Sequence, residues 1–532
     1  MDKHFIKQAM LHYYVKNCLV PLLLVLYSFS GVAQSNTKEF RKLMWEGNQG
    51  FEIGDYLNAK IAFEKAEAID STNKELNYKL GMCKFEIKKF RHDSRKNFER
   101  IKSADYPEAN YYLGILYHLS KDFDKAIASF NAYQSAKGEK EHLAKEINDL
   151  LIKCYSAQLL ESTKYSSVEI ENLGPTINTE FPEYVPLIPA DEKFMIFTSR
   201  RKNELHDKQN VYGEYYEDIY QTFRNNGNWS APKLLDSTIN TVTHDACTGL
   251  SADGEKLLLF RTSKDTRTGD ILESNFINAV WTKPTPLRLN VNSSDYIESS
   301  ACYSPNNDIV FFSSNRMGGF GGKDLYYVKK LPDGTWGIPR NLGENVNTEY
   351  NEDAPFVDAL GKTVYFSSEG HTNMGGYDVF KSNFDEAGYF TKAVNLGSPI
   401  NTVNDDVFFV LNPDSSVAYL SSEREGGYGS QDIYKVYFND NPATLKVYDV
   451  HVQDEQNAFI KNVDITLYDA KTNELVGKYK SNPNSGKIIF ISRPQRQFKI
   501  QIQANGYETK LLENYSLAGN YDVLFTLTKS AK

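Results

Sequence analysis

The feature of this 532-residue chain that most constrains its fold is a repeat of about 54 residues between positions 165 and 440. In each copy a short apolar run ending in serine or threonine, such as FFSS (311–314), precedes a loop and a second run that begins with aspartate, such as DLYY (324–327). A turn such as YSPNNDI lies before the first run, and several copies end in an NLG-like segment. Four short strands per copy are the content of one β-propeller blade. The aspartates that mark the five copies are Asp218, Asp270, Asp324, Asp378 and Asp432.

These units resemble the WD40-like repeats of TolB-type propellers, and the resemblance implies a β-propeller over residues 165–440. The ends of the repeat predict the number of blades. The last copy stops at DIYKVYF without an outer NLG strand, whereas an extra VEIENLGPTIN (168–178) precedes the first copy. We therefore expect five blades, with the N-terminal strand completing the fifth. A sixth blade made from a degenerate segment is the alternative.

Two sets of acidic residues recur with the repeat. The aspartate that begins each third strand is expected to accept hydrogen bonds from the preceding loop and so to pin its blade. A second acid enters each first strand, which lines the central channel of a propeller, so this set could ring one channel mouth and attract a cation or a basic partner segment. The alternative is that each acid of this second set caps its local turn. The second set consists of Glu183, Asp245, Glu298, Asp353 and Asp406.

The glycine-rich loop inside FFSSNRMGGFGGKDLYY (311–327) looks at first like a phosphate cradle. Such a cradle requires a helix after the glycines, with its N-terminus facing the phosphate. Here the glycines lead into another strand, and similar loops, TNMGGYD and EGGYGSQD, recur in the next two copies. Hairpin turns that need positive φ are the better interpretation. The insertion RRKNELHDKQNVYGEYYE (200–217) lengthens the first copy alone, so it is a stronger candidate partner site.

Residues 36–162 predict a helical solenoid. Gly47, Gly81 and Gly114 recur at intervals of 34 and 33 residues, and DYLNAKIAFEKA and DFDKAIASFNAY follow the first and third of them. The pattern resembles the tetratricopeptide repeat, in which a small residue lies where two helices cross. The middle copy departs from it, with Asp93 where alanine is expected and a shifted Phe98. The resemblance implies a groove that binds peptide or protein; a simple spacer is the alternative.

Residues 443–530 predict a third, all-β domain. The alternation in ITLYD and KIQIQ is typical of half-buried strands joined by turns. Together with the NPNSGK turn and ANGYE, this block resembles the carboxypeptidase regulatory-like β-sandwich, which implies an accessory domain with no chemistry of its own.

The N-terminus predicts export. Lys3, Lys7 and Lys16 precede the apolar run LVPLLLVLYSFSG (19–31), and Ala33 provides a small residue for cleavage. This is the pattern of a cleaved signal peptide over residues 1–33; a single membrane anchor is the alternative. The net charge of −9 argues against nucleic acid as the main partner.

The sequence predicts neither an enzyme nor a cofactor or metal site. No nucleophile elbow is present, since GLSAD and GYGSQ lack the closing glycine. The cysteines after the predicted signal peptide form no CxxC pair, and we expect each to be a small buried apolar residue. Paired metal-ligand spacing is also missing from His206, His244, His371 and His451.

The order of modules resembles one family as a whole. A signal peptide, a tetratricopeptide solenoid, a propeller and a regulatory-like sandwich follow one another in the PorE-type periplasmic proteins of type IX secretion and gliding. The resemblance implies a non-catalytic scaffold of the periplasm, associated with the outer membrane through partners such as a PorP/SprF-type barrel. The family's OmpA-like domain has no counterpart in this sequence, which puts peptidoglycan binding in doubt. The alternative function is a periplasmic binding protein for a small ligand, glycan or exported peptide at the propeller mouth.

Overall fold

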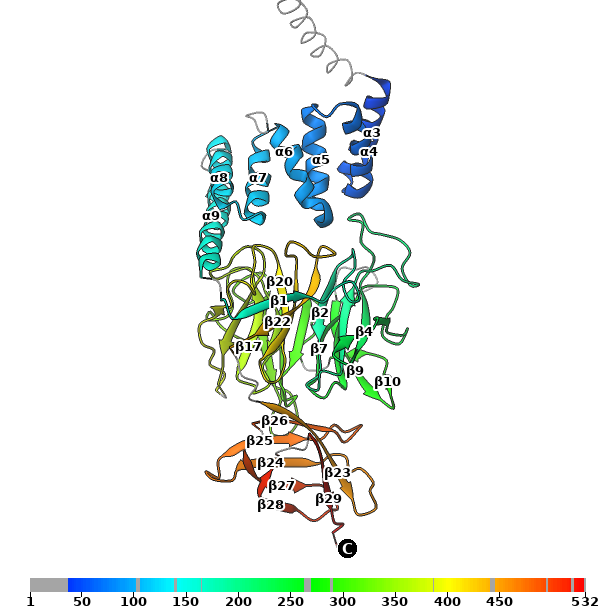
Figure 1. Cartoon of the computed structure of the whole chain (residues 1–532), viewed down its shortest axis with the longest axis vertical. Coiled ribbons are helices and arrows are strands. Elements are labelled where there is room, and N and C mark those ends of the chain that lie inside the picture. The colour runs from blue at the N-terminus through cyan, green and yellow to red at the C-terminus, as the bar shows by residue number, and fades with distance from the viewer. Residues whose placement is uncertain are drawn as a thin grey trace, which may run out of the picture. The chain divides into compact units, whose positions relative to one another are not determined.

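The computed structural model describes residues 37–101, 106–137, 141–163, 165–262, 269–287, 290–385, 387–440, 445–493, 496–517 and 521–530. The predicted signal peptide lies outside these residues. The chain divides into two compact units, of which the first comprises Met1–Leu151 and Gln209–Glu214 and the second Ile152–Lys208 and Tyr215–Lys532. Each unit is described by itself (Figure 1).

The first unit is built from helices that pack in consecutive pairs. Side-chain caps fix where three of them begin: Thr37, Asp55 and Asn73 each accept a hydrogen bond from a backbone N–H in the first turn. A short 3₁₀ segment, η2 (Lys88–Asp93), precedes the second helix of the middle pair. The helices are α3 (Lys38–Glu52), α4 (Tyr56–Ile69), α5 (Lys74–Glu86), α6 (Ser94–Ile101), α7 (Glu108–Leu119), α8 (Phe123–Lys137) and α9 (Glu141–Ser162), the last of which belongs to this unit only as far as Leu151.

Each helix pair closes on a contact between a glycine and a phenylalanine ring. A Cβ atom added to Gly47 would lie 2.4 Å from the ring of Phe63, and the same distance separates such an atom on Gly114 from Phe130. In the middle pair the corresponding distance from Gly81 to Phe98 is 3.0 Å, so the shifted Phe98 still reaches the crossing. A side chain at Gly47 or Gly114 would push the two helices of its pair apart, whereas one at Gly81 would require a smaller shift of the Phe98 ring. The glycine spacing of the sequence is therefore a packing requirement.

Part of the predicted insertion belongs to the helical unit. The backbone N–H of Leu57 donates to the carbonyl oxygen of Val211 at 3.1 Å, and the rings of Tyr56 and Tyr212 lie 6.2 Å apart. The insertion is therefore divided, since residues 209–214 contact α4 while its flanking residues belong to the second unit.

Five antiparallel sheets in the second unit form the blades of a propeller. Their central strands are buried on both faces between neighbouring blades, which is why they read as continuous apolar runs such as IVFFSS. The strands, blade by blade, are β2 (Glu183–Leu187), β3 (Phe194–Ser199), β4 (Asp218–Asn225), β5 (Asn228–Trp229) and β6 (Lys233–Leu234); β7 (Asp245–Leu250), β8 (Lys256–Thr262), β9 (Gly269–Ile277), β10 (Val280–Trp281) and β11 (Thr285–Pro286); β12 (Glu298–Tyr303), β13 (Ile309–Ser314), β14 (Asp324–Lys329) and β15 (Arg340–Asn341); β16 (Glu352–Val357), β17 (Thr363–Ser368), β18 (Asp378–Asn383) and β19 (Val394–Asn395); β20 (Asp406–Leu411), β21 (Val417–Ser422) and β22 (Asp432–Phe438).

The fifth blade is completed by the strand that precedes the first. Strand β1 (Val168–Asn172) pairs antiparallel with β22, with Val168 opposite Phe438 and Asn172 opposite Tyr434. The sheet order β1-β22-β21-β20 closes the ring as the sequence predicted. The described strands thus give five blades.

Two further sheets follow the propeller and enclose one apolar core. Their orders are β26-β23-β29 and β25-β24-β27-β28. Alternating residues of these strands, such as Ile465, Leu467, Ile500 and Ile502, are fully buried between the sheets. This sandwich-like arrangement consists of β23 (Lys446–Asp454), β24 (Asp464–Asp469), β25 (Leu475–Lys480), β26 (Ile488–Ser492), β27 (Gln497–Gln503), β28 (Lys510–Ser516) and β29 (Asp522–Leu527).

Two properties of the described part bear on the sequence predictions. Within it, none of the helices combines the length and the apolar character needed to span a lipid bilayer. The four cysteines there, Cys83, Cys154, Cys247 and Cys302, are not joined in disulfides and are buried, as expected of small apolar residues.

Candidate functional site

The acids that enter the first strands are fully buried caps of their local loops. In blade three, Glu298 accepts hydrogen bonds from the Ser293 N–H at 3.0 Å and the Ser314 hydroxyl at 2.7 Å, and Arg316 donates to the same carboxylate at 3.1 Å. These bonds correspond to the turn-capping alternative for this set. Four other carboxylates occupy the same strand position and are equally buried: Glu183, Asp245, Glu352 and Asp406.

Blade four requires a correction of register. Glu352 lies opposite Ser368, as Glu298 lies opposite Ser314, so the fourth member of the set is Glu352 and not the predicted Asp353. A shift of one residue along a strand turns the side chain to the other face. Glu352 accepts from the Thr348 N–H at 2.9 Å and the Ser368 hydroxyl at 2.7 Å, and burial raises the pKa of its carboxyl.

In four blades the aspartate that begins the third strand accepts hydrogen bonds from the loop before it, as predicted for a pinning residue. Asp324 accepts from the backbone N–H groups of Phe320 at 2.7 Å and Gly321 at 3.0 Å, and from the Asn341 amide at 2.6 Å. Asp218, Asp378 and Asp432 are buried at the same position. Asp270 differs from the other four in being exposed, and the loop before it, residues 263–268, lies outside the described residues, so its predicted role stays a prediction.

A set of asparagines that the sequence reading missed makes the same bonds in all five blades. In blade three, Asn347 accepts from the Leu325 N–H at 2.8 Å and donates to the Leu325 carbonyl at 3.0 Å. Each of these asparagines lies in the loop before a first strand, five or six residues ahead of its capping acid. The signal for them in the sequence was the recurring Ile-Asn or Val-Asn of each repeat. The set is Asn178, Asn240, Asn292, Asn347 and Asn401.

Backbone bonds between blades place another set of residues at the channel mouth. The backbone carbonyl of the residue before the pinning aspartate accepts a hydrogen bond from the backbone N–H of the next blade's capping acid. The Glu352 N–H donates to the Lys323 carbonyl at 2.7 Å, and the Asp245 N–H donates to the Glu217 carbonyl at 3.0 Å. The last and first blades are joined in the same way, with Gln431 accepting from the Glu183 N–H at 2.8 Å. The side chains of Lys323 and Glu217 are therefore fixed at blade boundaries.

On one side of the mouth, Lys323 and Asp353 form an ion pair between blades three and four. The Ser299 hydroxyl donates to Asp353 at 2.9 Å, and the Ser300 hydroxyl donates to it as well. Burial alone would raise the pKa of Asp353, but the Lys323 ammonium and these bonds outweigh burial and lower it. Asp353 is thus an ionised group that is only half-buried, whereas the side chains of the capping acids are fully buried.

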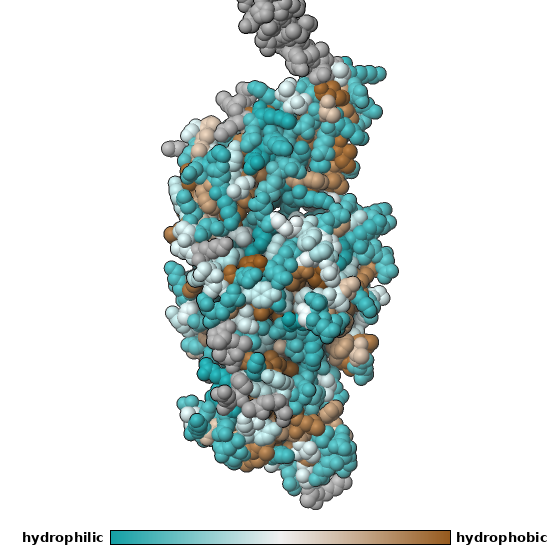
Figure 2. Space-filling model, in the orientation of Figure 1, coloured by the Kyte–Doolittle hydropathy of each residue, from teal (hydrophilic) through white to brown (hydrophobic). Residues whose placement is uncertain are grey.

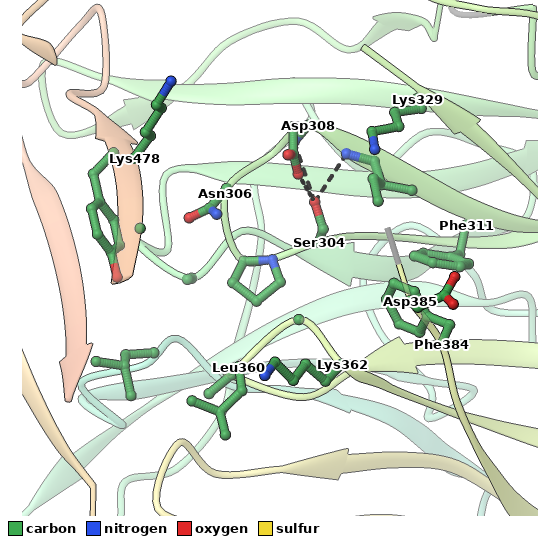
Figure 3. Close-up of a pocket in the computed structure, with 18 of the residues that line it drawn as sticks. Ser304, Asn306, Asp308, Phe311, Lys329, Leu360, Lys362, Phe384, Asp385 and Lys478 are labelled. Atoms are coloured by element: carbon green, nitrogen blue, oxygen red, sulfur yellow. Dashed lines mark hydrogen bonds between the residues drawn. The ribbon is translucent and has the colours of Figure 1, made fainter. Parts of the chain in front are cut away.

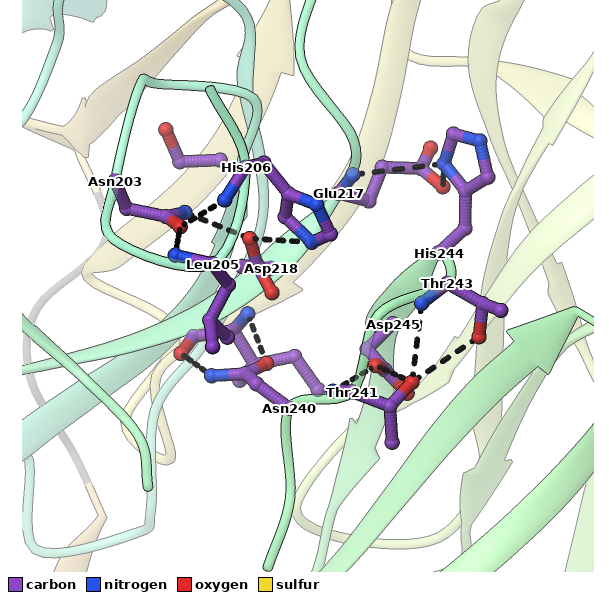
Figure 4. A network of polar contacts seen from close by, with 12 residues as sticks. Asn203, Leu205, His206, Glu217, Asp218, Asn240, Thr241, Thr243, His244 and Asp245 are labelled. Carbon is purple, nitrogen blue, oxygen red and sulfur yellow. Dashed lines mark hydrogen bonds and ion pairs between the residues drawn. The ribbon is translucent and has the colours of Figure 1, made fainter. Parts of the chain in front are cut away.

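A second charged group occupies blade one. Glu217 lies 2.8 Å from His244 Nδ1 (Figure 4). It also contacts Arg200 at 2.8 Å, and the Tyr184 hydroxyl donates to the same carboxylate. Burial acts to raise the pKa of Glu217, but Arg200 and His244 hold it well below its ordinary value. Burial and the Glu217 charge raise the pKa of Tyr184 well above its usual range.

The pin of blade one uses side chains from the insertion. Asn203 donates to Asp218 at 2.7 Å, and His206 Nε2 lies 3.4 Å from the same carboxylate (Figure 4). Burial raises the pKa of Asp218 to about 7 and lowers that of His206. The ring of Tyr216 lies between the two histidines, 5.1 Å from His206 and 4.4 Å from His244.

The channel beneath the mouth is packed with apolar side chains. Residues of the first strands, among them Val185, Cys247 and Val410, belong to one core cluster, and Phe356 and Phe408 pack against it. A ligand at this end of the propeller would therefore meet the polar mouth and not a through-going pore. Within the described part of the chain, no group of histidine, cysteine, aspartate and glutamate side chains could hold a metal ion.

Comparisons with known proteins give only distant structural likenesses. No protein-family model matches it, and no curated protein does. A solved structure described as TolB from Agrobacterium tumefaciens is 16% identical, covers 51% of this chain and 97% of its own, and has a TM-score of 0.27. The propeller domain of the trilobed protease from Pyrococcus furiosus, described as having an open velcro topology, is 9% identical over 64% of this chain and 85% of its own, with a TM-score of 0.25. A gluconolactonase from Xanthomonas campestris is 11% identical over 52% of this chain and 91% of its own, with a TM-score of 0.28. The strand order of the chain itself, and not these likenesses, defines its propeller.

Proposed function

We propose that this chain is a non-catalytic scaffold of the bacterial periplasm that associates with the outer membrane through a PorP/SprF-type barrel protein. In this proposal it is a PorE-type protein of type IX secretion or gliding. Its helix pairs are tetratricopeptide repeats, its blades are WD40-like repeats, and its last domain is a carboxypeptidase regulatory-like sandwich.

The observation that carries the proposal is the repeated helix pair. Three consecutive pairs close on the same glycine–phenylalanine crossing, and such stacked pairs present an extended surface that serves protein or peptide binding. The first pair leaves large apolar side chains in solvent: Trp45 is 63% exposed and Ile53 is 79% exposed. Figure 2 shows hydrophobic residues gathered over α3 and α4. Apolar side chains grouped on an otherwise polar surface mark a contact site.

Mild crosslinking in cells followed by affinity purification tests the scaffold role. We expect a barrel protein of the outer membrane to co-purify in stoichiometric amount. The Trp45→Glu variant should lose this partner, whereas Val280→Glu, a matched change at an exposed apolar residue of blade two, should retain it. Retention of the barrel protein by both variants would show that the first helix pair does not contact it. Absence of any barrel protein would refute the scaffold role.

The second candidate function is a periplasmic protein that binds a small ligand, glycan or exported peptide at the propeller mouth. It is favoured by the half-buried charges of Lys323, Asp353 and Glu217, which offer both donors and acceptors at one end of the propeller. A glycan or peptide that co-purifies in place of a barrel would support this function. The Asp353→Asn variant should then lose the ligand, while Asp270→Asn, at an exposed aspartate of blade two, should keep it.

A further inference from the structure

A large cavity lies in the second unit at the end of the propeller opposite the mouth. Its volume is about 2400 Å³, and it is lined by the turns that follow the first strands of blades three to five and by residues of the sandwich (Figure 3). Pockets for small molecules usually measure roughly 300–1,000 Å³. This cavity is therefore large enough for a segment of a polymer.

Positive charge gathers around the cavity although the chain as a whole is acidic. Five exposed cationic side chains line it, and within the described residues none of them forms an ion pair: Lys329, Arg340, Lys362, Lys478 and Arg493.

The acids of the lining are held by their own turns. Asp308 accepts from the Ser304 hydroxyl at 2.7 Å, Asp385 from the Tyr389 N–H at 3.0 Å and Asp414 from the Ser416 N–H at 3.0 Å. The cations are thus left to attract an anionic occupant.

Apolar side chains are exposed in the same lining. Leu331, Ile338, Leu360 and Leu475 are between 44% and 74% exposed, although large aliphatic residues are usually buried. An occupant that covered them would gain apolar burial in addition to ion pairs. The lining therefore suits a molecule with both acidic and apolar groups.

A strand of the sandwich presents an open edge to the cavity. Strand β25 lies at the end of the sheet order β25-β24-β27-β28, and five consecutive residues of it, 475–479, line the cavity. Figure 3 shows Lys478 facing the cavity from the sandwich, across from Asn306 and Asp308 of blade three. An edge strand carries unpaired N–H and C=O groups that an extended chain can join.

We propose that this cavity binds an extended, acidic segment of a partner protein, which adds to the open edge of β25. Side chains alternate between the two faces of a strand, so acidic residues of the segment reach Lys329 and Lys478 while its apolar residues cover Leu360 and Leu475. The proposal is independent of the scaffold role, because it concerns the purified chain and a synthetic peptide, and it stands or falls without any barrel partner.

Fluorescence anisotropy with the purified chain tests the proposal. The probe is a labelled peptide of alternating glutamate and valine, about ten residues long, which is the upper length of an ordinary strand. The comparison peptides replace glutamate by lysine or carry a methyl group on every second backbone nitrogen. We expect the acidic peptide to bind, the lysine peptide not to bind, and N-methylation to abolish binding because it removes donors from one strand edge.

The variant that carries the test is the double change Lys329→Glu and Lys478→Glu. We expect it to weaken binding of the acidic peptide by at least about tenfold, since two attractive charges become repulsive. Lys283→Glu, an exposed lysine of blade two outside the cavity, is the matched control and should bind normally.

Four results would overturn the proposal. The first is a failure of the acidic peptide to bind, and the second is equal binding by the double variant. The third is equal binding of the N-methylated peptide, which would reduce the interaction to charge attraction without strand addition. The fourth is binding of phosphatidylglycerol vesicles in place of the peptide, lost in the double variant, which would make the cavity a lipid site.

Discussion

Blades one and three hold the same strand position in different ways. In blade three Asp324 is pinned by two backbone N–H groups of its glycine-rich loop and by Asn341. In blade one Leu234 occupies the register position of Asn341, and the donors to Asp218 come from the insertion. The repeat places a carboxyl group at this strand position in both blades, whereas the loop before it determines which groups donate hydrogen bonds to it. In blade one burial raises the pKa of this carboxyl to about 7, although the hydrogen bond from Asn203 of the insertion acts to lower it.

The largest expected effect tests what the two blades share. Arg316→Ala should destabilise the propeller by about 3–5 kcal/mol, because Glu298 is left as a buried charge without its guanidinium. Arg201→Ala should cost a similar amount through Glu183 in blade one. The urea midpoint of propeller unfolding measures both.

Adding Glu298→Gln to Arg316→Ala should recover much of that loss, since the uncompensated charge is removed. If the single and double variants were equally unstable, packing of the arginine and not its charge would explain the cost.

The next effect separates the two pins. Asp324→Ala should cost about 2–3 kcal/mol, since it leaves the N–H groups of Phe320 and Gly321 and the Asn341 amide without their acceptor. Asp218→Ala should cost less, because a carboxyl that is half protonated near pH 7 contributes less to its network. Urea unfolding at pH 7 compares them, and equal losses would contradict the distinction.

A pH series sharpens the same comparison. The folded-state pKa of Asp218 is about 7, above the ordinary value of about 3.9 for an unfolded chain. Between those values the folded state binds the extra proton, so this group makes stability fall as pH rises from about 4 to about 7. Asp218→Asn should therefore become increasingly favourable relative to the parent chain across that window.

The matched Asp324→Asn variant should be less stable than the parent chain instead, because an amide cannot accept all three hydrogen bonds there. A pH-independent difference between Asp218→Asn and the parent chain would show that Asp218 is ionised throughout.

The smallest effect concerns the glycine-rich loop. Gly318 has φ of +89° and open space around it, so Gly318→Ala should cost about 1 kcal/mol through backbone strain alone. Gly318→Asn should cost less, because asparagine adopts positive φ more readily. Thermal melting compares the two, and a neutral alanine variant would show that the loop relaxes.

The sequence was most informative where one residue type recurs at one strand position. The period predicted the pinning aspartates of four blades and the closing strand around Val168, because those bonds are made within a copy or by its direct equivalent. It was least informative where two adjacent residues could occupy the same buried strand position. Glu352 and Asp353 are adjacent acids, and the strand register alone determines which of them is buried. The pairing of Lys323 with Asp353 joins two blades, so a reading of single copies cannot find it.

The closing pair β1–β22 has a consequence for how the chain folds. Val168 lies opposite Phe438, so the ring cannot be completed until nearly the whole propeller has been synthesised. Blades one to four assemble from contiguous segments, whereas the fifth waits for its two distant halves to meet, and such long-range contacts form slowly. Until then β22 presents an unpaired edge. Exchange of β1 between two chains is therefore the expected route of misassembly when the protein refolds at high concentration.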